Sequence, residues 1–196
     1  MATSDQRTGA TTGAMTGSRP AALLDPVLIG RGLAVIRIFF GLILFANGLA
    51  KLFAFTRVAV GQWWITNLID RPGAQSILNS LANKDRPGTK QLPGLRWVAN
   101  ELILDNWAWF QWVLTATELG VGALLILGLA SRGAALVGFG FQFLLALYYL
   151  PTNKWSFEQP HEYVPLLVLA LVPAGRVWGL DGWLLRRRPA LRRWPF

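Results

Sequence analysis

The stretch FQWVLTATELGVGALLILGLA, residues 110–130, decides the fold of this chain. It runs for 21 residues with a single charged side chain, Glu118. A helix needs about 20 apolar residues to cross the hydrocarbon core of a bilayer. The stretch therefore predicts a transmembrane helix over about residues 109–130. An ionisable group inside such a helix is costly, so Glu118 is a functional candidate from the outset.

Three more stretches predict spans, over about residues 32–55, 133–150 and 163–180. Pro173 is expected to kink or end the last of them. A soluble four-helix bundle would show polar outer faces at the helical period, whereas these stretches are apolar nearly all round. The predicted fold class is therefore all-α, an integral membrane four-transmembrane-helix bundle.

The remaining segments set the domain organisation. Residues 1–28 are rich in Thr, Gly, Ala and Ser and predict a disordered cytoplasmic tail. Residues 29–185 form the membrane domain, and residues 186–196 form a basic cytoplasmic tail. Residues 56–106 form a long extracytoplasmic loop between the first two spans.

The long loop is expected to carry short helices on the outer surface. Two of its stretches have apolar residues at helical spacing, a third leads into the second span, and Pro-Gly pairs punctuate them. The stretches are GQWWITNLID (61–70), QSILNSLANK (75–84) and LRWVANELILDNWAWF (95–110). Their tryptophans are expected at head-group depth.

Charge and composition narrow the class of protein. The formal net charge is +9, but the basic residues flank the apolar stretches, which favours membrane topology over nucleic-acid binding. Their distribution predicts that both termini are cytoplasmic. The chain has no cysteine, which excludes disulfides, iron–sulfur clusters and dithiol relays. No haem, metal or nucleotide motif is present.

Two ionisable residues inside the spans are the main site candidates. Arg37 lies in the first span and Glu118 in the second. Their depths predict a polar seam between them, which either handles protons or a ligand or only fixes helix packing. Lys51 is near the outer end of the first span, where it is expected to snorkel. Gln142 is expected to bond across the bundle, and His161 to lie at the outer surface.

Three stretches give the chain a family resemblance. They are RIFFGLILFANGLAKL (37–52), ELGVGALLILGLASRGAAL (118–136) and PHEYVPLLVLALVPAGRVWGLDGWL (160–184). In this order they resemble the DoxX/DoxD group of four-helix bacterial membrane proteins. The long loop and the His-containing start of the last stretch are more similar to the DoxD type, the small subunit of a thiosulfate:quinone oxidoreductase.

The resemblance implies a bacterial inner-membrane protein that works with a protein partner in redox chemistry. By the family's pattern, the residues expected to matter are Arg37, Lys51, Glu118, Arg132, His161 and Asp181. A quinone is the implied cofactor, bound by Arg37, Lys51, Glu118, Gln142 and Arg132, with Glu118 or His161 as the proton-handling candidates.

Three functions remain open from the sequence. The first is an accessory subunit of a quinone-linked oxidoreductase, since the chain has no self-contained catalytic motif. The second is a non-enzymatic membrane scaffold or assembly partner whose outer loop docks another protein. The third is a small proton-coupled transporter, against which the lack of inverted repeats counts.

Overall fold

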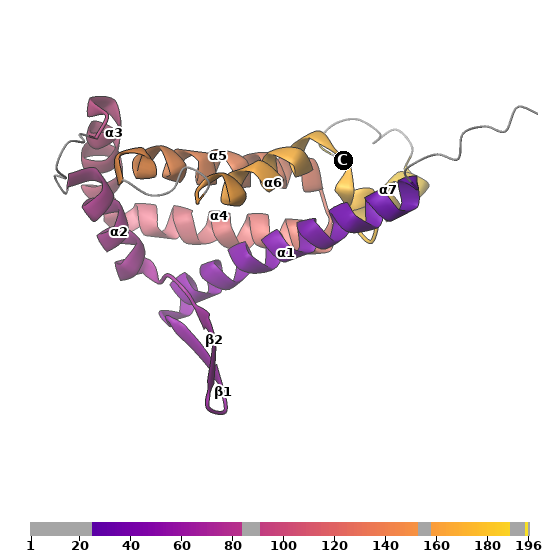
Figure 1. Ribbon diagram of the computed structural model, residues 1–196, viewed down its shortest axis with the longest axis horizontal. Coiled ribbons are helices and arrows are strands. Elements are labelled where there is room, and N and C mark those ends of the chain that lie inside the picture. The colour runs from indigo at the N-terminus through magenta and orange to yellow at the C-terminus, as the bar shows by residue number, and fades with distance from the viewer. Residues whose placement is uncertain (1–24, 84–90, 153–157, 189–194, 196) are drawn as a thin grey trace, which may run out of the picture.

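The computed structural model describes residues 25–83, 91–152, 158–188 and 195. Most of the two expected cytoplasmic tails, residues 1–24, 189–194 and 196, lies outside the described residues. The described chain is mostly helical, as predicted. Four helices lie along one long axis (Figure 1). They are α1 (Pro26–Phe53), α4 (Trp107–Leu127), α5 (Ser131–Tyr149) and α6 (Pro160–Leu171).

Three helices, beginning at Pro26, Trp107 and Ser131, are long and apolar enough to cross a membrane. They match the first three predicted spans. α1 has 28 residues and so extends for about 42 Å. It starts six residues before the expected span, because Asp25 caps its first turn by accepting a hydrogen bond from the Val27 N–H at 2.9 Å.

The predicted fourth span, residues 163–180, is not one continuous helix. α6 has 12 residues, or about 18 Å, which is too short to cross a bilayer alone. It ends at Leu171, and Val172 is extended before Pro173, so the predicted break at this proline is confirmed. A 3-10 turn, η3 (Ala174–Arg176), and the short α7 (Leu180–Arg187) follow.

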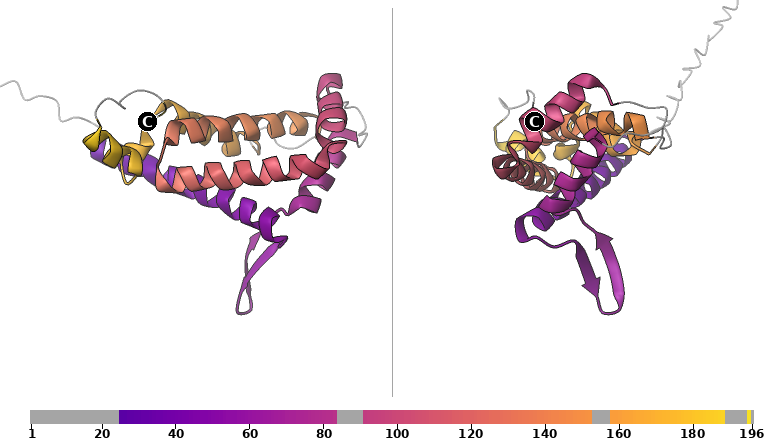
Figure 2. Two further views of the ribbon diagram at one scale, coloured as in Figure 1. Left: turned by 180° about the vertical axis from the view of Figure 1, so that it is seen from behind. Right: turned by 90° about the vertical axis from the view of Figure 1, so that its left-hand side faces the viewer.

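The long loop folds across one end of the bundle, here called the loop end. α2 (Arg71–Asn83), α3 (Pro93–Trp97) and the π-helix η1 (Val98–Leu104) lie there (Figures 1 and 2). α7 and the start of α1 lie at the opposite end, here called the termini end. These helices overlap two of the three stretches predicted to carry short helices, residues 75–84 and 95–110.

The prediction of a helix in residues 61–70 is wrong. This segment belongs to an antiparallel hairpin of β1 (Arg57–Val60) and β2 (Trp63–Asn67). Its strands are rich in β-branched and aromatic residues, which prefer strands. Gly61 adopts φ +62° at the two-residue turn, a conformation that glycine reaches without strain.

The bundle is held together by apolar packing and by close approach of α1 to α4. Gly41, Gly48 and Gly122 form the contact between these helices. A Cβ added at Gly122 would lie 2.5 Å from the backbone nitrogen of Phe45. One built on Gly48 would lie 2.7 Å from Cγ of Leu119. Small residues at these positions let the helices approach more closely than larger side chains would allow.

A hydrogen-bonded cluster fixes the loop segments onto α5. The Tyr148 hydroxyl donates to the carbonyl of Leu95 at 2.9 Å. The Gln91 side-chain amide donates to the carbonyls of Tyr148 at 3.1 Å and Leu81 at 3.3 Å. Tyr148 also packs against Leu81, Ala82 and Ala99. The loop segments α2, α3 and η1, here called the loop cap, therefore have a defined position on the end of the bundle.

The α1–α4 contact can be tested with two glycines of one helix. Gly122→Ala is expected to lower the stability of the protein by about 1–3 kcal/mol, because the new methyl group meets the α1 backbone. Unfolding in mixed detergent micelles measures the change. Gly120→Ala is the matched control, since a Cβ there meets no other atom within 4 Å. Equal effects of the two substitutions would contradict the packing argument.

Candidate functional site

The centre of the candidate site is a buried ion pair between α1 and α4. The ammonium nitrogen of Lys51 lies 2.8 Å from Oε2 of Glu118, and the two side chains are 3% and 9% exposed. Lys51 sits in the last turn of α1, and Glu118 near the middle of α4. The predicted snorkelling of Lys51 is therefore wrong. Its charge points inward to Glu118, at the end of the bundle towards which α1 and α4 splay apart (Figure 1).

The pair is tied to the loop by the peptide of Ile69. The Lys51 ammonium donates to the Ile69 carbonyl at 2.9 Å. The Ile69 N–H donates to the side-chain carbonyl of Asn47 at 3.2 Å. Asp70 follows and caps α2 by accepting from the Gly73 N–H at 2.8 Å. The start of α2 is thus held directly over the ion pair.

Gln142 belongs to the same layer of the bundle. A Cβ on Gly138 of α5 would lie 3.2 Å from Val121 of α4, so these two positions face each other. One turn towards the loop end on each helix brings Gln142 and Glu118 to one level. The side-chain carbonyl oxygen of Gln142 is buried and has no hydrogen-bond partner among the described residues. A buried acceptor of this kind favours a bound donor.

Arg37 does not form the predicted seam with Glu118. Its Nη2 donates to the carbonyl of Trp178 at 2.9 Å. Its guanidinium packs against Gly128, ten residues from Glu118 along α4, or about 15 Å. The hypothesis failed because the ion-pair partner of Glu118 comes from the far end of α1. Arg37 is fully buried.

Arg37 borders a second polar cluster at the termini end, built around Asp181 of α7. The fully buried carboxylate of Asp181 accepts from the Ala130 N–H at 2.7 Å, the Ser131 N–H at 3.1 Å and the Ser131 hydroxyl at 2.8 Å. The Ser131 oxygen in turn accepts from the Gly175 N–H at 3.0 Å. Asp181 thus satisfies the free N–H groups where α5 begins.

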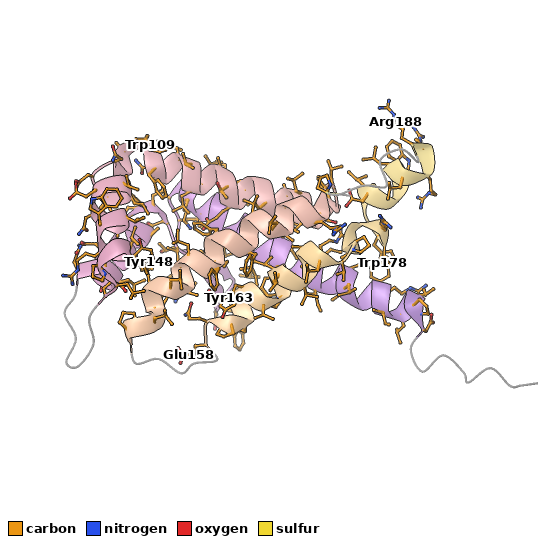
Figure 3. All side chains as sticks on the ribbon, turned by 90° about the horizontal axis from the view of Figure 1, so that it is seen from above. Trp109, Tyr148, Glu158, Tyr163, Trp178 and Arg188 are labelled. Carbon is orange, nitrogen blue, oxygen red and sulfur yellow. The ribbon has the colours of Figure 1, made fainter. Side chains whose placement is uncertain are left out.

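The remaining predicted site residues are placed elsewhere. Arg132 lies beside the Asp181 cluster, where its Nε donates to the carbonyl of Ala170 at 3.1 Å. His161 is exposed near the start of α6. Ring contacts of Tyr163 with Phe139 and Phe143 place this start partway along α5. Figure 3 likewise shows Tyr163 nearer the termini end than Tyr148.

The structure therefore brings together Lys51 and Glu118, with Gln142 at the same level of the bundle, and it separates this pair from Arg37 and Arg132. The Ile69 contact was missed, because no sequence pattern marks a backbone carbonyl as a lysine partner. Among the described residues, no three His, Asp or Glu side chains gather as a metal site.

No family model, no curated protein and no solved structure matches this chain.

The ion pair predicts a strong coupling between its two members. Lys51→Met is expected to cost about 3–5 kcal/mol, because it leaves a buried carboxylate without a counter-charge. The double variant Lys51→Met/Glu118→Gln is expected to recover most of that loss. A double-mutant cycle from unfolding in detergent micelles measures the coupling. Additive effects of the two substitutions would rule out the pair.

The Asp181 cluster predicts that substitutions of Asp181 lower the stability by an amount that depends on how many acceptor oxygens remain. Asp181→Ala is expected to cost at least about 3 kcal/mol, because three buried donors lose their acceptor. Asp181→Asn retains one side-chain oxygen and is expected to cost clearly less. Thermal unfolding of the purified protein compares the two variants. A melting temperature of Asp181→Ala equal to that of the wild type would show that α5 does not need this cap.

Proposed function

We propose that this chain is an accessory integral-membrane subunit of a quinone-linked oxidoreductase complex, which binds a quinone in the Lys51–Glu118–Gln142 layer. The observation that carries the proposal is the buried carbonyl oxygen of Gln142, which has no hydrogen-bond partner within the described part of the chain and lies at the level of a buried ion pair. Burying polar groups inside an apolar bundle costs free energy. Such groups therefore favour a function, such as binding a polar ligand.

The chemistry of the layer suits both redox states of a quinone. A quinol hydroxyl donates hydrogen bonds, and the Gln142 oxygen is an acceptor in need of a donor. A quinone carbonyl accepts hydrogen bonds, and an ammonium has three N–H donors. Lys51 donates one of them to the Ile69 carbonyl and forms an ion pair with Glu118, and a quinone carbonyl would accept from the same ammonium. A bound quinone would carry the electrons and protons.

The electrons would come from a partner protein. The chain has no cysteine and so cannot hold an iron–sulfur cluster. The resemblance to the DoxX/DoxD group favours such a partner. The loop end is the proposed docking side, because α2 connects the surface to Lys51 through the Ile69 peptide.

The proposed location is the bacterial inner membrane, with both termini cytoplasmic. Arg31, near the start of α1, and Arg186, Arg187 and Arg188, at the end of α7, are exposed, which suits the positive-inside rule. Figure 3 shows Arg188 at the termini end. We propose a fourth crossing by the broken α6–η3–α7 segment. Irregular backbone is tolerated within a membrane where protein covers it, and Ala174 and Gly175 of η3 are buried.

A second candidate is a non-enzymatic scaffold or assembly partner. The observation that favours it is the same ion pair, because Lys51 already neutralises Glu118 without a ligand. The loop cap is also firmly fixed by Gln91 and Tyr148, as a docking platform would need to be. In this case the polar layer only holds helices and cap together.

A thermal-shift experiment separates the two candidates. Decylubiquinone is expected to raise the melting temperature of the purified wild type. Gln142→Leu is expected to melt at or above the wild-type temperature without ligand, because it removes an unpaired buried oxygen. It should also lose the decylubiquinone shift. Gln62→Leu, in the exposed hairpin turn, is the matched control and should retain the shift.

Organic extraction of the purified protein gives an independent readout. A co-purifying quinone that is depleted in Gln142→Leu but not in Gln62→Leu would support the redox proposal. If no lipid-soluble quinone is extracted and decylubiquinone leaves the wild-type melting temperature unchanged, the redox proposal fails. The scaffold candidate then takes its place.

A further inference from the structure

The β1–β2 hairpin is the most protruding part of the described structure. It leaves the loop end of α1 and extends sideways, across the long axis of the bundle (Figures 1 and 2). The turn begins at Ala54, which adopts the left-handed conformation with φ 56°. The Leu68 N–H donates to the Thr56 carbonyl at 2.8 Å and closes the base of the hairpin. The hairpin therefore has a defined direction.

This direction places the hairpin along a membrane surface. α1 is one of the three helices able to cross a bilayer, so its axis is expected to run through the membrane. A segment that extends across this axis from the end of α1 runs parallel to the bilayer plane. At the end of α1, Leu52 and Phe53 are apolar and exposed, with Phe53 69% accessible. The hairpin thus starts at the depth where the hydrocarbon core ends.

The side chains of the hairpin are suited to that depth. Residues 58–66, VAVGQWWIT, contain no charged group. Val60 and Trp63 are direct cross-strand partners and share one face of the hairpin. They are 58% and 78% exposed, so nothing in the described chain covers this face. Tryptophan prefers the membrane–water interface, where its ring and its N–H are both accommodated.

The backbone of the hairpin limits how deeply it can sit. A two-stranded sheet leaves a row of unpaired N–H and C=O groups on each outer edge. In hydrocarbon each such group costs several kcal/mol, about the cost of a lost hydrogen bond without water. In water, an isolated two-stranded hairpin is only marginally stable. The head-group region satisfies both demands, since it offers water to the edges and apolar contact to one face.

Other exposed tryptophans lie at the same end of the bundle as the hairpin. Trp97, Trp109 and Trp112 are each about half exposed and lie at the loop end. Figure 3 shows Trp109 at this end of α4. Arg71 stacks over the Trp112 ring at 4.3 Å, which places a cation beside the aromatic surface as in a head-group belt. Like these residues, the hairpin face presents an exposed tryptophan at the loop end.

We infer that the hairpin is an interfacial foot, which lies in the head-group layer of the bilayer with Val60 and Trp63 facing the acyl chains. The inference rests on the membrane placement of α1 but not on quinone binding. The lipid surface is the occupant that fits the uncharged face, the sideways direction and the depth set by α1. The foot would fix the height of the loop end relative to the membrane.

Spin labelling tests this inference cleanly, because the chain has no native cysteine. Val60→Cys is labelled in protein reconstituted into phosphatidylethanolamine–phosphatidylglycerol vesicles, and Trp63→Cys is a second variant. Val35→Cys, on the exposed face of α1, is the hydrocarbon reference, and Glu101→Cys, exposed on η1, is the water reference. The ratio of collisions with oxygen to collisions with a nickel chelate reports depth. Both hairpin labels are expected between the two references.

Each other outcome overturns the inference. A collision ratio at Val60 and Trp63 equal to that at Glu101 would place the hairpin in water, open to a soluble partner. Spin–spin broadening that disappears on dilution with unlabelled protein would show that a second copy covers the face. A water-like ratio at Val35 would remove α1 from the membrane and the foot with it, whatever the thermal shifts with decylubiquinone show. Wild-type helicity by circular dichroism verifies that each variant is folded.

Discussion

The structure depends on neutralising two charges inside an apolar bundle. A lone carboxylate at the middle of α4 would be intolerable in hydrocarbon, and so would a lone ammonium in the last turn of α1. Their contact at 2.8 Å requires α1 to run against α4 in one register. The glycines at the helix contact permit that register. The Ile69 carbonyl accepts a hydrogen bond from Lys51 and so connects the loop cap to the ion pair. Bundle and cap are therefore positioned by one electrostatic requirement.

The two ends of α5 are held by different chemistry. At the termini end a carboxylate of α7 binds the backbone N–H groups where the helix begins. At the loop end Gln91 and the Tyr148 hydroxyl connect its last turn to the cap. Both contacts span long stretches of sequence. They hold in place the helix that carries Gln142, and so they define the polar layer as firmly as the ion pair does.

Sequence alone predicts the features that depend on composition and on local chemistry. Apolar length locates the first three long helices, and the proline rule locates the break after Leu171. Glu118, Lys51 and Gln142 stand out as polar residues in apolar surroundings. Sequence does not predict which cation meets Glu118, because the register and splay of α1 against α4 decide this. It also misjudged residues 61–70, where aromatic and apolar residues fit a helical spacing while the glycine turn selected a hairpin.

The position of Asp181 has a consequence for the order of events during synthesis. The residues that it binds, Ala130 and Ser131, emerge from the ribosome about fifty residues earlier. Until α7 is made, the first peptide groups of α5 must stay with water or lipid head groups, so this end of the bundle stays open. α7, which is translated after α5, therefore closes this end of the bundle. A chain released before it would carry all three long helices and still lack a closed bundle.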